Sequence, residues 1–284
     1  MKKKYERLIV FFVGFPLVVS VVLLLPQMGH LAGNIILITL SAIGAYEFAA
    51  MLGKKHTSIH PVESVLLGIL GPFTMTLVVS FGVPLTIVPI ALMAGASWFL
   101  VSAVFSPART FPPFLNRLSA GLSTLIYPGL FIIWVIRMNI WPHASYIVLV
   151  FLAIVLLNDA AAWATGNLFG ATNKGYFAAS PSKSLAGFAG GFAASIILGI
   201  MAVYCLPAGF TPTLLHGIPS GIILGLVSSF AANVGDLAES VMKRSAQVKD
   251  SGAVILGRGG ALDSIDSLAL TAPVYYLCYQ LLFR

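Results

Sequence analysis

Charged residues are scarce in this chain of 284 residues. Asp, Glu, Lys and Arg make up 9% of it, against roughly 25% in a soluble globular protein. Hydrophobic residues make up 58%, which is more apolar surface than a soluble fold can bury. A membrane helix needs about 20 apolar residues, and runs of that length recur along the whole sequence. The composition therefore excludes an ordinary soluble domain and predicts a helical membrane protein.

Two other features are missing. The 16 basic residues are scattered over the loops and form no basic arm, which argues against a nucleic-acid partner despite the net charge of +7. The two cysteines, Cys205 and Cys278, stand alone in apolar runs without CxxC spacing. This pattern indicates small packing residues and argues against a zinc or redox site.

The apolar runs predict an all-α, polytopic fold of about nine membrane spans. The first is interpreted as a retained helix, because its apolar stretch is too long for a signal peptide and no small-residue cleavage site follows. We treat residues 1–284 as one transmembrane domain, with amino-terminal helices in 1–140 and catalytic helices and loops in 141–284. The predicted spans are 8–25, 31–52, 63–82, 84–106, 117–140, 144–168, 185–207, 219–243 and 262–283.

The orientation follows from the basic residues. With the amino terminus in the cytoplasm, 14 of the 16 lie in inside segments and only Arg137 and Arg284 lie outside, as the positive-inside rule requires. Eight spans are the main alternative, since Gly82-Val83-Pro84 is a very short loop. Merging the spans on its two sides would scramble the charge pattern of every later loop, so nine is preferred.

Acidic residues number only nine, yet five sit where a membrane helix should not tolerate them without a reason, because a carboxylate at membrane depth is costly and marks a functional site by default. They are Glu47, Asp159, Asp236, Asp263 and Asp266. In the predicted topology, the four aspartates lie at a similar depth near the cytoplasmic face. Clustered carboxylates suit a hard divalent cation, and Mg²⁺ fits better than Zn²⁺ because no His or Cys accompanies them. Two simpler interpretations stay open: Asp263 could only cap the last helix, and Asp159 could only pair with Asn158 or Asn167.

Two segments are suited to binding phosphate. In the glycine-rich stretch 166–191, hydroxyl and amine side chains precede a predicted helix, where free backbone N–H groups and the helix dipole favour an anion; these are Ser180, Ser182, Lys183 and Ser184. A plain loop with a serine cap is the alternative. In the second segment, 243–260, cations alternate with glycines and one acid before Asp263; these are Lys243, Arg244, Lys249, Asp250, Arg258, Gly259 and Gly260. Within the eighth span, Asp236, Glu239, Ser240 and Lys243 form one polar stripe.

These motifs resemble the phosphatidate cytidylyltransferase (CDP-diacylglycerol synthase) family. The resemblance covers roughly 155–275 and rests on 235–244 (GDLAESVMKR), 249–252 (KDSG), 259–268 (GGALDSIDSL), Asp159 and 180–191. It implies an integral membrane enzyme that joins CTP and phosphatidate, uses one or two Mg²⁺ ions and forms a homodimer. It also implies that Asp236, Asp263 and Asp266 hold the metal, with Lys243 and Arg244 beside them. The chain departs from the usual pattern at Arg258, where His is common, and at Ser264, where Arg is common.

Two other functions fit some of these residues. A polyprenol or phytol kinase also consumes CTP, and an ion-coupled transporter also carries carboxylates within the membrane. Against the transporter, the polar residues gather at one face, and no inverted repeat is evident. We therefore predict a multi-pass protein of the cytoplasmic membrane with its active site facing the cytoplasm.

Overall fold

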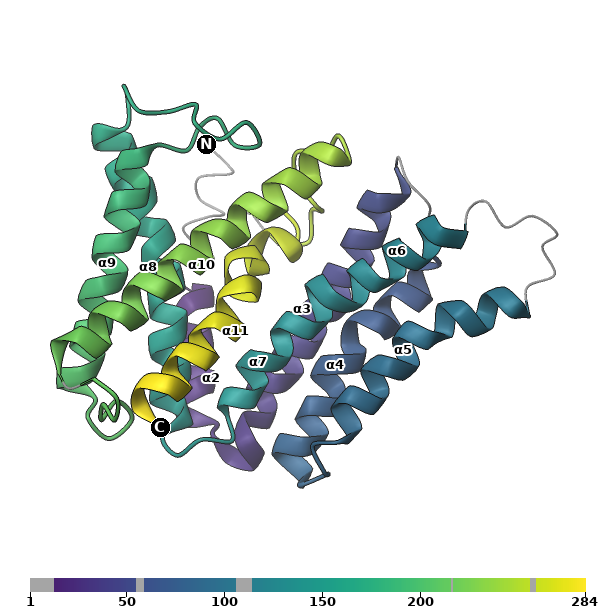
Figure 1. Ribbon diagram of the computed structural model, residues 1–284, viewed down its shortest axis with the longest axis horizontal. Helices are drawn as coiled ribbons and strands as arrows, with labels where there is room; N and C mark the ends of the chain where they lie inside the picture. Colours follow the sequence, from purple (N-terminus) through teal and green to yellow (C-terminus); the bar gives the residue numbers. More distant parts are fainter. Residues whose placement is uncertain (1–12, 55–58, 106–113, 216, 256–258) are drawn as a thin grey trace. The chain divides into compact units, whose positions relative to one another are not determined.

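The computed structural model describes residues 13–54, 59–105, 114–215, 217–255 and 259–284. Helices account for most of this part of the chain (Figure 1), and its only β-type pairings are two isolated bridges, Lys174 with Ser184 and Ile255 with Gly259. The predicted all-α class is confirmed. Arg258 and the first residues of the first predicted span lie outside the described residues.

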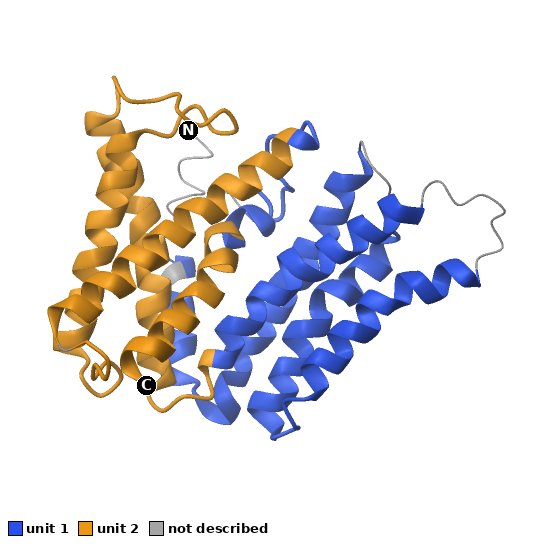
Figure 2. Ribbon diagram, viewed as in Figure 1, with its two compact units in different colours: residues 1–137, 245–265 blue, residues 138–244, 266–284 orange. Residues whose placement is uncertain are grey.

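The chain forms two compact units (Figure 2). Unit 1 comprises residues 1–137 and 245–265, and unit 2 comprises residues 138–244 and 266–284. The first boundary between the two units, after residue 137, lies close to residue 140, beyond which the sequence contains most of the predicted polar motifs. The segment 245–265 follows the predicted catalytic helices in sequence but belongs to unit 1. Each unit therefore carries some of the predicted site residues.

Unit 1 is a bundle of apolar helices. Its elements are α2 (Phe15–Leu24), α3 (Gln27–Gly53), α4 (Pro61–Phe81), α5 (Ile87–Val104), α6 (Phe114–Thr124), η2 (Leu125–Leu130) and α7 (Phe131–Met138, whose last residue is assigned to unit 2). Helix α3 packs along α4, and α4 packs against α5 and η2 (Figure 1). Gly82 ends α4 in the left-handed conformation at φ +70°, which a glycine adopts without strain, so α4 and α5 are separate helices.

The span predicted at 117–140 is interrupted in its middle. Pro128 lacks a backbone N–H and cannot continue a regular α-helix, and residues 125–130 form a π-helical turn. The Ser41 hydroxyl from α3 contacts the carbonyl oxygens of Pro128 and Gly68. This hydroxyl joins α3, α4 and the π-turn, so the irregular backbone has a buried polar partner.

Unit 2 contains α8 (Ala144–Phe169), α9 (Leu185–Cys205), α10 (Ile218–Ser245) and α11 (Leu262–Phe283), although the first four residues of α11 belong to unit 1. Helices α8 and α9 pack along each other. The buried Tyr275 hydroxyl of α11 donates to the Ile147 carbonyl of α8 at 3.0 Å. At the same end of α11, the rings of Tyr276 and Trp141 stack with their centroids 4.4 Å apart.

Seven helical segments of the described chain are long and apolar enough to cross a membrane. They match the second to eighth predicted spans and identify a multi-pass membrane protein. The other two predicted spans correspond to α2, which is short within the described range, and α11, which carries Asp263 and Asp266. The count of nine spans and the cytoplasmic amino terminus stay predictions.

Candidate active site

Three carboxylates from three different helices approach one another in unit 2. Asp159 lies in the second half of α8, Asp236 in the second half of α10, and Asp266 in the second turn of α11. Asp266 lies within electrostatic range of the other two carboxylates and of the Lys243 ammonium. The Asp266 carboxylate also accepts the Ser267 backbone N–H at 2.6 Å. The structure therefore brings these three aspartates near one another, and their action as one site stays a prediction.

The packing of α10 on α11 explains how Asp236 and Asp266 come together. Gly235 is buried, and a Cβ atom at this position would lie 2.7 Å from the Asp266 carbonyl oxygen. Only glycine allows such close contact between the two backbones without a shift. The residue that precedes Asp236 in the sequence thus touches the backbone of Asp266.

Cations neutralise part of this negative charge. The Lys183 ammonium lies 2.5 Å from a carboxylate oxygen of Asp236, and their side chains are 20% and 35% exposed. Lys243 forms an ion pair with Glu239, one turn earlier on α10, whose side chain is fully buried. The Arg244 guanidinium donates to the Ala179 carbonyl at 3.3 Å. This part of unit 2 therefore combines the three aspartates and Glu239 with three cations, and the predicted polar stripe on α10 is present.

A buried amide network lies behind Asp159. The Asn158 amide donates to the Asp159 carboxylate at 3.3 Å, and its oxygen accepts the Ser229 hydroxyl at 2.6 Å and the Asn233 amide at 3.4 Å. The predicted pairing of Asp159 with Asn158 is confirmed. Ser229 and Asn233 were not predicted as site residues, although their four-residue spacing places them on one polar face of α10.

The amino terminus of α9 differs from the prediction. Ser184 is the N-cap, and its hydroxyl accepts the Gly187 N–H at 3.0 Å. Asn173 accepts the N–H groups of Leu185 and Ala186 through its backbone and side-chain oxygens. The expectation of free N–H groups at this terminus is wrong, because the preceding loop folds back over the first turn. Ser180 and Ser182 lie in that loop, partly buried and exposed respectively, and Lys183 is the one of the four that reaches a carboxylate.

Asp263 has a different environment, in unit 1. One of its oxygens accepts three hydrogen bonds, from the Ser251 N–H at 3.0 Å, the Ser251 hydroxyl at 3.0 Å and the Gly260 N–H at 2.8 Å. The carboxylate therefore organises the loop that precedes α11. Asp263 is the second residue of this helix and not its N-cap, which corrects the simpler capping interpretation. In that loop Lys249 and Asp250 are exposed, Gly259 is partly buried and Gly260 is buried.

Glu47 also contacts this loop. Its carboxylate accepts the Leu262 N–H at 3.0 Å and the Ser251 hydroxyl at 3.2 Å. The sequence marked Glu47 as a carboxylate within a predicted span but assigned it no role. Its partners lie more than 200 residues away in the chain, and no local pattern pairs them.

The donor set decides whether a metal ion fits. Among the described residues, no group of three or more His, Cys, Asp or Glu side chains is arranged to hold one. Mg²⁺, however, is commonly bound by one or two carboxylates together with substrate phosphates and water. Asp236 and Asp266 supply two carboxylates without competing nitrogen or sulfur ligands. The residues present fit that kind of site, and Asp263 as a third ligand stays a prediction.

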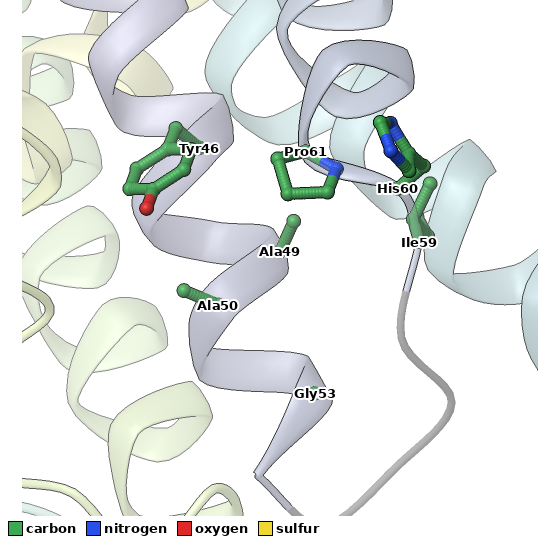
Figure 3. A pocket seen from close by; sticks show the side chains of 7 residues that line it. All are labelled: Tyr46, Ala49, Ala50, Gly53, Ile59, His60 and Pro61. Carbon is green, nitrogen blue, oxygen red and sulfur yellow. The ribbon is translucent and has the colours of Figure 1, made fainter.

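A separate cavity of about 420 Å³ lies in unit 1 (Figure 3). Tyr46, Ala49, Ala50 and Gly53 of α3 form one wall, and Ile59, His60 and Pro61 at the start of α4 form the other. This lining contains no carboxylate, Lys or Arg, so it does not suit a polyphosphate. None of the predicted site residues lines it.

Several known proteins are similar to this chain in sequence. The relatives named phosphatidate cytidylyltransferase include those of Synechocystis sp. (34% identical over 50% of this chain and 46% of the relative), Aquifex aeolicus (31%, over 57% and 58%) and Staphylococcus aureus strain COL (36%, over 45% and 46%). The chain thus spans about half the length of these relatives. The model of the cytidylyltransferase family matches residues 5–282. Since this match covers nearly every residue, the chain belongs to the cytidylyltransferase family.

Proposed function

We propose that this protein transfers the cytidylyl group of CTP to phosphatidate, giving CDP-diacylglycerol and diphosphate for phospholipid biosynthesis. The observation that carries the proposal is the gathering of Asp159, Asp236 and Asp266 with Lys183 and Lys243 in unit 2. A cluster of carboxylates and amines among apolar helices suits a reaction between a polyphosphate and a lipid phosphate. The names of the relatives point to the same substrates.

In the proposed reaction, a phosphate oxygen of phosphatidate attacks the α-phosphorus of CTP. The bond from that phosphorus to the bridging oxygen breaks, and diphosphate leaves with its electron pair. Transfer of this kind asks a protein for alignment and charge neutralisation more than for a covalent intermediate. Lys183, Lys243 and Arg244 are proposed to offset the phosphate charge, helped by Lys249 and Arg258. Ser180, Ser182, Ser184, Asp250, Gly259 and Gly260 complete the proposed substrate-binding set.

Asp236 and Asp266 are proposed to hold Mg²⁺, with Asp263 as a further ligand. When bound, the ion would neutralise charge on the phosphates and on the leaving group. The ion pair between Lys183 and Asp236 gives this carboxylate a counter-charge of its own. We also propose that the site faces the cytoplasm from the inner membrane, where CTP is available.

Labelled CTP in vesicles separates this proposal from its rivals. Purified protein receives Mg²⁺, an acceptor lipid, and CTP labelled on either the α- or the γ-phosphorus. Cytidylyl transfer to phosphatidate carries the α label into the lipid and releases the γ label as diphosphate. A polyprenol kinase carries only the γ label into the lipid, and an ion-coupled transporter moves neither. Lipid labelled from γ-labelled CTP, or no labelled lipid at all, would overturn the proposal.

A further inference from the structure

Glu47 is a buried carboxylate in the amino-terminal half of the chain. It lies in α3, its residue is 4% exposed, and its neighbours Ala45, Phe48 and Ala49 are buried apolar residues. Among the described residues, no Lys or Arg forms an ion pair with it. A buried charge is costly unless hydrogen bonds compensate it. Its partners should therefore indicate why a carboxylate is kept there.

Those partners belong to the loop before α11. One oxygen of Glu47 accepts the Leu262 N–H at 3.0 Å and the Ser251 hydroxyl at 3.2 Å, across 215 and 204 residues of sequence. Its other oxygen is buried and has no hydrogen-bond partner among the described residues. One side chain of α3 therefore binds both ends of the segment 251–262.

Two glycines let the loop approach Glu47 this closely. A Cβ atom at Gly252 would lie 2.1 Å from one Glu47 carboxylate oxygen, and a Cβ atom at Gly260 would lie 2.3 Å from the other. Real Cβ atoms essentially never come so near to another heavy atom. The carboxylate is held by Leu262 and cannot simply swing aside. Backbone from both sides of the loop thus encloses the Glu47 carboxylate.

We infer that Glu47 is a positioning residue, which holds residues 251–255 and 259–262 in the conformation that binds the polyphosphate of CTP. The inference rests on the proposed function, in which Asp250, Gly259 and Gly260 contact CTP. Glu47 touches none of the reacting atoms in this scheme. It acts by reducing the conformational freedom of a glycine-rich loop, which would otherwise be lost when substrate binds.

The test compares Glu47→Ala and Glu47→Gln with the wild type by amide hydrogen exchange and by steady-state kinetics. In Glu47→Ala, exchange should rise in residues 250–262 and stay normal in other helices, and the KM for CTP should rise on the order of tenfold. Glu47→Gln keeps an oxygen for the Leu262 N–H, so it should recover part of both effects. It also serves as the readout if the alanine variant fails to fold.

Glu63→Gln is the matched control. Glu63 is an acidic residue of the same unit that binds Arg117 at 3.0 Å and Trp98 at 2.6 Å, away from the loop contacts of Glu47. Its neutralisation removes a hydrogen-bonded carboxylate from unit 1 but should leave exchange in 250–262 and the KM for CTP unchanged. An equal rise of exchange in Glu63→Gln would mean that Glu47 acts only through the stability of unit 1.

A double-mutant cycle tests the contact directly. Gly252→Ala alone should raise the KM for CTP, because its methyl group clashes with the Glu47 carboxylate. In the Glu47→Ala background that space is open, so the double variant should be no worse than Glu47→Ala. Additive losses, or normal exchange in 250–262 of Glu47→Ala, would overturn the inference. The exchange readout needs no enzyme activity, so it separates failure of this inference from failure of the proposed transfer reaction.

Discussion

At the scale of single residues, the aspartates of the signature have different partners. Asp236 forms an ion pair with Lys183. Asp266 lies in the electrostatic field of the Asp159 and Asp236 carboxylates and of the Lys243 ammonium. Asp263 accepts three hydrogen bonds from the loop that precedes α11. A metal ligand and a loop organiser respond differently to loss of charge. Replacement by Asn, which keeps size and one oxygen, therefore distinguishes the two roles.

We predict that Asp236→Asn and Asp266→Asn each lower cytidylyl transfer on the order of 100-fold or more, since a bound cation contributes several kcal/mol to charge stabilisation. The double variant should be little worse than either single one, because residues that act as a unit give non-additive losses. Steady-state rates over a Mg²⁺ titration measure this, and high Mg²⁺ should partly restore the single variants. Full additivity would contradict a shared site.

Asp263→Asn completes that comparison. The asparagine oxygen can still accept the N–H groups of Ser251 and Gly260, so a residue that only organises the loop would tolerate the change with little loss. A metal ligand would lose activity and metal affinity as Asp236 does. Near-normal activity with unchanged Mg²⁺ dependence would remove Asp263 from the metal site and leave it as the organiser of its loop.

Lys183 forms an ion pair with Asp236, one of the proposed metal ligands. We predict that Lys183→Ala raises the KM for CTP about tenfold and leaves folding intact, because it removes a charge that a partly exposed pair places beside the phosphates. Lys174→Ala, an exposed lysine of the same loop, is the control and should behave as the wild type. Unchanged kinetics in Lys183→Ala would favour the alternative interpretation, in which the segment 180–184 is a plain loop with a serine cap.

At the scale of helices, the site depends on how closely α10 and α11 pack. Gly235→Ala would place a methyl group 2.7 Å from the Asp266 carbonyl oxygen. Overpacking of this kind costs about 1–3 kcal/mol, and displacement of α11 should also lower transfer activity. Thermal unfolding in detergent and the labelled-CTP assay measure the two effects. The control is Val234→Ala, at the more exposed preceding position, which should change neither the unfolding temperature nor the transfer activity. A stable and active Gly235→Ala variant would show that α10 and α11 can separate at no cost to function.

At the scale of the whole molecule, the testable property is orientation in the membrane. In a variant without Cys205 and Cys278, single cysteines at Lys54 and Lys174 should react with an impermeant maleimide only from the cytoplasmic side. A cysteine at Leu214, which is exposed between α9 and α10, should react only from the outside. This pattern follows from 14 inside cations against two outside. Labelling of position 54 or 174 from the outer face would contradict the topology and the cytoplasmic site.

Much of the architecture could be predicted because the solvent is lipid. Each span must satisfy its backbone within one helix, so apolar run length alone located α3 to α10 to within a few residues. The same reasoning marked five acids within the spans, of which Glu47 is buried, since a carboxylate in such a run needs a specific cause. The break at Gly82 and the Ser184 cap also follow from local residue chemistry. The π-turn at Pro128 was not predicted, because its stability depends on partners from α3 and α4.

What the sequence determined by itself is the class of fold, the approximate spans and the acids and cations that carry the chemistry. Only the tertiary structure decided how these are grouped: Asp159, Asp236 and Asp266 together in unit 2, and Asp263 with Ser251, Gly260 and Glu47 in unit 1. The physical reason is the distance along the sequence over which the two kinds of interaction act. Helix formation and burial depend on residues within a few turns, whereas hydrogen bonds between Glu47 and residues more than 200 positions away depend on how whole helices pack.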